Sequence, residues 1–147
     1  MIKKVAIEEL IPIIIETINN NKTISFTPSG NSMLPTIDNK KDVVILANPQ
    51  GFKKYDLLLI KYQNKYILHR LVKIKNDNYY FCGDHNVCLE GPIKKVDILA
   101  KVTNYTHKGK NIKINKSFYI KGKILFLSRK IRSILRRIFH AGDFKTS

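Results

Sequence analysis

The chain has 147 residues, which suits one domain with a single hydrophobic core. Its composition, 44% hydrophobic and 26% charged, excludes an intrinsically disordered protein. The formal net charge is +16, and most of it lies in residues 101–147, which hold 13 Lys/Arg and one acid. A basic field of this kind attracts anions such as lipid headgroups, nucleic-acid phosphate or acidic peptides.

Residues 1–22 form the first predicted segment, with a helix from about Glu8 to Asn19. The apolar residues that recur at the spacing of one buried helix face are Leu10, Ile13, Ile14 and Ile18. Glu8 and Glu9 suit the positive end of the helix dipole. The sequence therefore predicts a short amphipathic helix that covers the core of the domain.

The sequence contains neither a predicted membrane span nor a predicted secretory signal. No apolar run approaches the ~20 residues that a spanning helix needs. Glu8, Glu9 and Glu16 lie where a secretory signal would be apolar. We therefore expect a cytoplasmic protein, with peripheral attachment to a membrane as the remaining option, and we expect both cysteines to be reduced thiols.

Residues 23–116 are predicted to form a small, mostly antiparallel β-domain. Short apolar runs alternate with turn residues, which is typical of strands joined by hairpins. The predicted strands are Val43–Ala47, Leu57–Tyr62, Tyr66–Ile74, Tyr79–Cys82, Ile98–Tyr105 and Ile112–Ile114. The fold class is therefore mainly β, with one helix before the β-domain and one after it.

Residues 117–147 are predicted to form a basic amphipathic tail, helical over Ile120–Phe139. Its apolar stripe consists of Ile120, Ile124, Leu127, Ile131, Ile134, Leu135 and Ile138. Seven Lys/Arg residues surround the stripe, a composition typical of a helix lying on an anionic membrane. Two alternatives stay open: a helix packed on the β-domain with a solvated basic face, or a contact with an acidic partner or, less favoured, nucleic acid. The membrane interpretation predicts that the tail is dispensable for chemistry.

Ser32 and His69 are the residues that most strongly suggest chemistry. Ser32 lies in a turn rich in Gly, Asn and Pro, and a serine hydroxyl becomes a nucleophile only when a nearby base takes its proton. His69, on a predicted strand 37 residues later, is the candidate base. The simpler interpretation is a turn-forming serine and a half-buried strand histidine without a chemical role.

Three blocks in order, Gly30–Thr36, His69–Arg70 and Gly83–Asn86, resemble the clan of signal peptidase I and the SOS repressors, which are serine peptidases. The resemblance covers roughly residues 27–105. It implies a signal-peptidase-like β-domain and a serine endopeptidase that uses no cofactor. It also implies an extended peptide or a leader- or signal-type substrate, with small residues next to the scissile bond. It also implies Ser32 as nucleophile, His69 as general base in the branch that uses histidine rather than lysine, and Asp84 as the group that orients His69. Glu90 lies near the place where many relatives carry a further aspartate.

Three other functions are weighed against this one. A non-enzymatic basic module could keep the peptidase-like fold while binding a membrane or nucleic acid. Self-cleaving switches of the SOS type use a lysine base and cut themselves before the nucleophile at pairs such as Ala-Gly or Cys-Gly. Residues 1–31 contain neither pair and are too few for a DNA-binding domain. Cys82, His85 and Cys88, with His69, could in principle approach a zinc ion, but their spacing is not that of a known structural zinc site. We therefore predict no metal, and the resemblance implies no cofactor.

Overall fold

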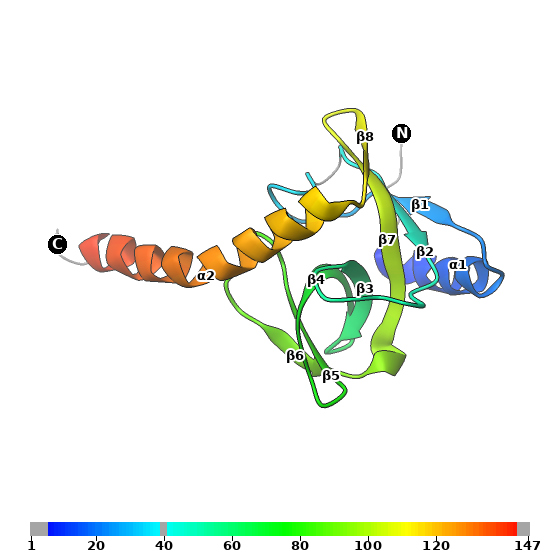
Figure 1. The fold of residues 1–147 in the computed structure, drawn as a ribbon, viewed down its shortest axis with the longest axis horizontal. Coiled ribbons are helices and arrows are strands. Elements are labelled where there is room, and N and C mark those ends of the chain that lie inside the picture. Colours follow the sequence, from blue (N-terminus) through cyan, green and yellow to red (C-terminus); the bar gives the residue numbers. More distant parts are fainter. Residues whose placement is uncertain (1–5, 39–40, 144–147) are drawn as a thin grey trace.

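The computed structural model describes residues 6–38 and 41–143, so residues 1–5 of the first predicted segment and 144–147 of the tail lie outside the described residues (Figure 1). It confirms a mainly β fold: an eight-stranded antiparallel sheet with a helix before it and a helix after it. In chain order the elements are α1 (Ile7–Asn19), β1 (Ile24–Phe26), β2 (Val44–Ala47), β3 (Leu57–Tyr62), β4 (Lys65–Lys75), β5 (Asn78–Cys82), β6 (Glu90–Ile93), a 3₁₀ turn (Lys95–Asp97), β7 (Ile98–His107), β8 (Lys110–Lys113) and α2 (Lys116–Asp143).

The strand order is β1-β2-β7-β3-β4-β5-β6, and β8 pairs with β7. Strand β3 lies near the middle, between β7 and β4, and both of its faces are buried. Leu57 and Leu59 point into the larger hydrophobic cluster, whereas Leu58 and Ile60 point into a second cluster. Because successive side chains of a strand point to opposite faces, β3 contributes to a hydrophobic cluster on each side of the sheet. A sheet of this shape can bury single polar side chains between two cores.

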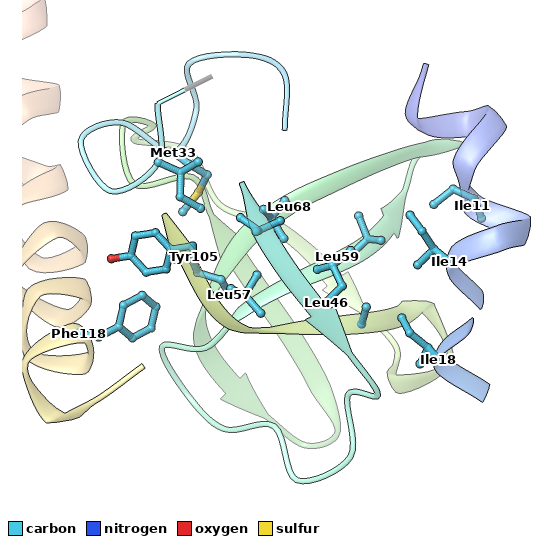
Figure 2. Close-up of a cluster of buried hydrophobic side chains, with 14 residues drawn as sticks. Ile11, Ile14, Ile18, Met33, Leu46, Leu57, Leu59, Leu68, Tyr105 and Phe118 are labelled. Atoms are coloured by element: carbon cyan, nitrogen blue, oxygen red, sulfur yellow. The ribbon is translucent and has the colours of Figure 1, made fainter. Parts of the chain in front are cut away.

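The two helices lie at opposite ends of the larger cluster (Figure 2). Helix α1 contributes Ile11, Ile14 and Ile18, and Phe118 of α2 packs at the other end beside Tyr105. The prediction that Ile13 belongs to the buried face is wrong, because its side chain is 53% exposed. Several helix faces of this isoleucine-rich segment satisfy helical spacing, so packing on the sheet decides which one is buried.

All six predicted strands are found to within two residues at each end, but the sequence did not predict β1 or β6. Strand β1 is only three residues long, and β6 contains Gly91 and Pro92, which are depleted in strands. Strand β6 forms because it pairs with β5, where Phe81 lies opposite Glu90. Both missed strands therefore depend on a neighbouring strand rather than on their own residues.

Helix α2 begins as part of the β-domain and not as a separate tail. Phe118 is buried in the larger cluster, and the Tyr119 hydroxyl donates to the Asp56 carboxylate at 2.6 Å. Burial, together with that carboxylate, raises the pKa of Tyr119. At Gly122 a Cβ atom would lie 2.4 Å from the Arg70 guanidinium, so only glycine allows this approach. The first turns of α2 therefore pack on the β-domain, which is one of the alternatives that the sequence left open.

The second half of α2 projects beyond the sheet (Figure 1). Neither described helix combines the length and the apolar character that crossing a bilayer demands.

Asp42 fixes the end of the long segment that joins β1 to β2. Its buried carboxylate accepts hydrogen bonds from the Asp38 N–H at 2.7 Å, from His107 Nδ1 at 2.9 Å and from the Lys108 N–H at 3.3 Å. Burial acts against ionisation, but these bonds outweigh it and lower the pKa of Asp42. The charged carboxylate therefore ties this segment to the turn between β7 and β8.

We predict that Phe118→Ala lowers the free energy of unfolding by about 3–5 kcal/mol, the range for removing a buried phenylalanine side chain. Phe139→Ala is the matched control, because the Phe139 side chain is 72% exposed on the same helix and should cost little. Urea unfolding followed by circular dichroism measures both. Equal stability of the two variants would contradict the assignment of the start of α2 to the core.

We also predict that Asp42→Asn destabilises the fold in a pH-dependent way. A lowered pKa in the folded state contributes stability above the unfolded value of ~3.9, and that stability is lost as pH falls through the folded pKa. The variant should lose about 1–3 kcal/mol at pH 7, and the gap to the wild type should shrink towards pH 3. Urea unfolding at pH 7, 5 and 3 tests this, with exposed Asp77→Asn as control. A gap that is constant with pH would show that the charge of Asp42 does not contribute.

Candidate active site

Ser32 is held by a turn whose apolar residues anchor in the core. Met33 and Ile37 are buried in the larger cluster, and the Ile37 N–H donates to the Met33 carbonyl at 2.9 Å. Gly30, which precedes the turn, has φ +89°, a backbone conformation that favours glycine. The turn therefore exposes part of the Ser32 side chain, while the nearby side chains of Met33 and Ile37 are held in the core.

His69 lies on β4 opposite Leu58 of β3 and is only 5% exposed. Its Nε2 atom is 3.0 Å from Ser32 Oγ, so the structure brings together the two residues that the sequence paired. Side chains from Leu68 to Val72 are all buried, which means that both faces of β4 are covered here. The imidazole therefore has little freedom to leave Ser32.

The second ring nitrogen of His69 contacts Glu90 and not Asp84. Nδ1 lies 2.6 Å from Glu90 Oε2, and Glu90 is the first residue of β6. The prediction that Asp84 accepts the second N–H of His69 is therefore wrong. Glu90 reaches the ring because β6 pairs with β5, and β5 pairs with β4 beyond His69.

For the neutral imidazole, these contacts assign the tautomer of His69. An ionised carboxylate only accepts hydrogen bonds, so Nδ1 carries the proton that it donates to Glu90. The unprotonated Nε2 then accepts a hydrogen bond from the Ser32 hydroxyl. A neutral imidazole held in this way can take a proton at Nε2, and the carboxylate stabilises the imidazolium that results.

Asp84 instead forms a buried ion pair with Arg70. Arg70 Nε donates to Asp84 Oδ1, and Arg70 Nη2 donates to Asp84 Oδ2, both at 2.7 Å. The Thr36 hydroxyl also donates to Oδ2. Arg70 follows His69 directly on β4, so its side chain leaves the strand on the opposite face. Asp84 therefore braces the turn that carries Ser32 and does not contact the imidazole.

The Ser32 turn and the loop after β5 pack backbone against backbone. The His85 N–H donates to the Ser32 carbonyl at 2.9 Å. At Gly83 a Cβ atom would lie 2.6 Å from that same carbonyl oxygen, so a larger residue would push the turn away. Gly83 thus permits the contact that positions Ser32.

Three arginines of α2 hold the same loop from outside, and we refer to Arg129, Arg132 and Arg136 as the inner arginines. They donate to the carbonyls of Val87 (3.2 Å), Asp84 (2.9 Å) and His85 (3.3 Å), respectively. The sequence did not predict this role, because a basic helix without acidic neighbours indicates a solvated or anion-binding face. Backbone carbonyls, which leave no trace in the sequence, are the partners instead.

A small pocket of about 90 Å³ opens beside Ser32 and His69. Its walls are mainly apolar and include Phe26, Met33 and Leu68. One water occupies ~30 Å³ of liquid, so the pocket matches a small side chain. A larger hollow of about 490 Å³ is lined by Asn48, Phe52 and Tyr79 and does not include Ser32 or His69, so size alone does not locate the site.

Cys82, His85 and Cys88 differ in their surroundings. Cys82 is buried, its thiol donates to the Gly83 carbonyl, and burial raises its pKa to about 11, whereas His85 and Cys88 are exposed. A thiol with this pKa stays protonated at neutral pH, and zinc binds the thiolate. Among residues 6–38 and 41–143 no cluster of three His, Cys, Asp or Glu side chains is arranged to hold a metal ion.

We predict that Asp84→Asn mainly lowers the stability of the fold, whereas Glu90→Gln mainly changes the state of the His69 imidazole. Asp84→Asn leaves the guanidinium of Arg70, which is 1% exposed, without its counter-charge and should cost about 3–5 kcal/mol. Glu90→Gln should cost much less because Glu90 is partly exposed, but it should change the tautomer balance of His69. Urea unfolding and the ¹⁵N chemical shifts of the His69 imidazole measure the two effects. A changed His69 spectrum in folded Asp84→Asn, with an unchanged one in Glu90→Gln, would contradict the assignment.

The chain matches no model of a known protein family, no curated protein and no solved structure.

Proposed function

We propose that this protein is a serine endopeptidase that cleaves an extended peptide. The observation that carries the proposal is the continuous hydrogen-bonded chain from Ser32 Oγ through His69 to Glu90, with distances of 3.0 and 2.6 Å. A nucleophile in contact with a base, and a base oriented by a carboxylate, is the arrangement that acyl transfer requires. The resemblance of the three sequence blocks to the signal peptidase I and SOS-repressor clan supports the same reaction.

In the proposed reaction Ser32 Oγ attacks the scissile carbonyl carbon while His69 Nε2 takes the hydroxyl proton. Glu90 stabilises the imidazolium, and the Ser32 N–H is the donor that we assign to the developing oxyanion. The tetrahedral intermediate collapses when His69 returns the proton to the leaving amine, which leaves an acyl-enzyme on Ser32. A water molecule, deprotonated by His69, then attacks the acyl carbon. The ester bond to Ser32 Oγ breaks, His69 returns the proton to this oxygen, and the acid product leaves. The reaction needs no cofactor.

The backbone beside the site supports a peptide as substrate. Pairing between β4 and β5 begins at Arg70, so within the described residues the preceding part of β4 pairs with β3 alone. The small pocket lies along this part of β4, from Tyr66 to His69. An extended peptide could pair with this edge as an added strand. The pocket volume then favours a small side chain next to the scissile bond.

We predict that Ser32→Ala and His69→Ala each lower the cleavage rate by at least about 1,000-fold without loss of folding. The double variant should be little worse than either single variant, because the two side chains act as one unit. Cleavage of a synthetic peptide library with small residues at the scissile position, analysed by mass spectrometry, provides the rates. Ser25→Ala is the control, since Ser25 is an exposed serine of β1.

Intact-protein mass spectrometry after exposure to an activated peptide ester gives a second readout. Wild-type protein should gain the mass of one acyl group, mapped to the fragment that contains Ser32, and Ser32→Ala should gain none. A non-enzymatic module would show neither cleavage nor acylation. Wild-type rates in His69→Ala would exclude the proposed base.

A further inference from the structure

Helix α2 has two faces with different surroundings. One face packs on the domain through Phe118, Gly122 and the inner arginines. The other, which we call the outer face, consists of Ile120, Ile124, Leu127, Ile131, Ile134, Leu135 and Ile138, and these side chains are 46–62% exposed. Phe118, Gly122, Arg129, Arg132 and Arg136 each lie two positions before a residue of the outer face, which is about 200° around a helix. Most of the apolar stripe is therefore turned away from the domain, while Ile124 at its edge also lines a hollow beside Arg70 and Phe118.

Basic residues border the outer face, and no acidic residue lies among them. Lys123, Lys130 and Arg137 recur every seven residues, which places them in one exposed row beside the stripe; we call them the basic row. Lys121 lies on the other flank. Between Asp97 and Asp143 the sequence has no acidic residue. The surface thus combines an apolar stripe about 27 Å long with cations that no carboxylate of the helix neutralises.

We propose that the outer face of α2 binds an anionic lipid bilayer, with the helix lying in the plane of the interface. A convex apolar stripe flanked by cations fits a planar surface that offers hydrocarbon between negative headgroups. A second copy of the chain fits less well, because it would bring two basic rows together without acidic partners. The inner arginines would at the same time hold the loop beside the candidate active site on the side of α2 turned away from the bilayer.

The inference goes beyond the proposed peptidase function and does not rest on it. Ser32→Ala should bind vesicles as the wild type does, so failure of the catalytic proposal leaves the membrane result unchanged. The first measurement is co-sedimentation of full-length protein with vesicles of phosphatidylcholine and phosphatidylglycerol in equal parts, and with vesicles of phosphatidylcholine alone. Binding is expected on the anionic vesicles and should weaken between low and high salt, because salt screens the charges.

Two triple variants and one control separate the contributions of the stripe and the charge. Replacement of Ile124, Ile131 and Ile138 by Gln removes apolar area, and replacement of the basic row by Gln removes three charges while Gln keeps good helix propensity. Each should raise the apparent Kd at least about tenfold. Replacement of Lys41, Lys75 and Lys113 by Gln removes the same charge from exposed positions outside α2 and should change the Kd less than twofold. Circular dichroism confirms that each variant is folded.

A fluorescent reporter tests insertion directly, since the chain has no tryptophan. Leu127→Trp, on the outer face, should show a blue-shifted emission with anionic vesicles and quenching by brominated lipids. Ile74→Trp, an exposed position on β4, should show neither.

Four results would overturn the proposal. They are no sedimentation of the wild type with anionic vesicles, equal loss of binding in the control variant, unchanged binding of the stripe variant, and an unshifted Leu127→Trp emission in the presence of vesicles. Self-association that the stripe variant abolishes, without vesicle binding, would assign the outer face to a second copy. Binding to nucleic acid that depends only on the basic row would assign it to that partner.

Discussion

The structure depends on the buried ion pair between Arg70 and Asp84. A buried guanidinium is stable only when its charge is compensated and its N–H groups find acceptors. Arg70 meets this requirement with both oxygens of Asp84, with the Tyr55 carbonyl at 2.9 Å and with the ring of Phe118 at 4.5 Å. Asp84 in turn accepts from Thr36 in the turn that carries the nucleophile. One pair therefore joins β4, the nucleophile turn, the loop after β5 and α2.

The alternation of side chains along β4 separates chemistry from support. His69 and Arg70 are neighbours in the sequence, yet they point to opposite faces of the strand. On one face the imidazole lies between Ser32 and Glu90, and on the other the guanidinium holds Asp84. Any shift of β4 by one residue would exchange the two faces and destroy both arrangements at once. The same strand register thus sets both the candidate active site and its support.

Helix α2 uses its positive charge in two ways. The inner arginines donate to backbone carbonyls of the loop beside the site, so part of the charge is structural. The basic row faces outward with the apolar stripe and is the part that a bilayer could bind. The same helix carries both sets of residues, and its first turns are anchored in the core through Phe118. One element therefore contacts the loop beside the candidate active site and also presents the outer face.

The sequence by itself determined the mainly β fold, both helices, six strands and the pairing of Ser32 with His69, because these follow from local periodicity, turn residues and a short ordered motif. Only the tertiary structure decided which side chains face one another. The sequence could not separate Asp84 from Glu90, since the choice depends on how β6 pairs with β5. It also placed Ile13 in the core, because an isoleucine-rich helix has several faces of suitable spacing and only packing on the sheet selects one. Strand register and helix rotation are set by contacts between distant segments, and a local pattern does not contain them.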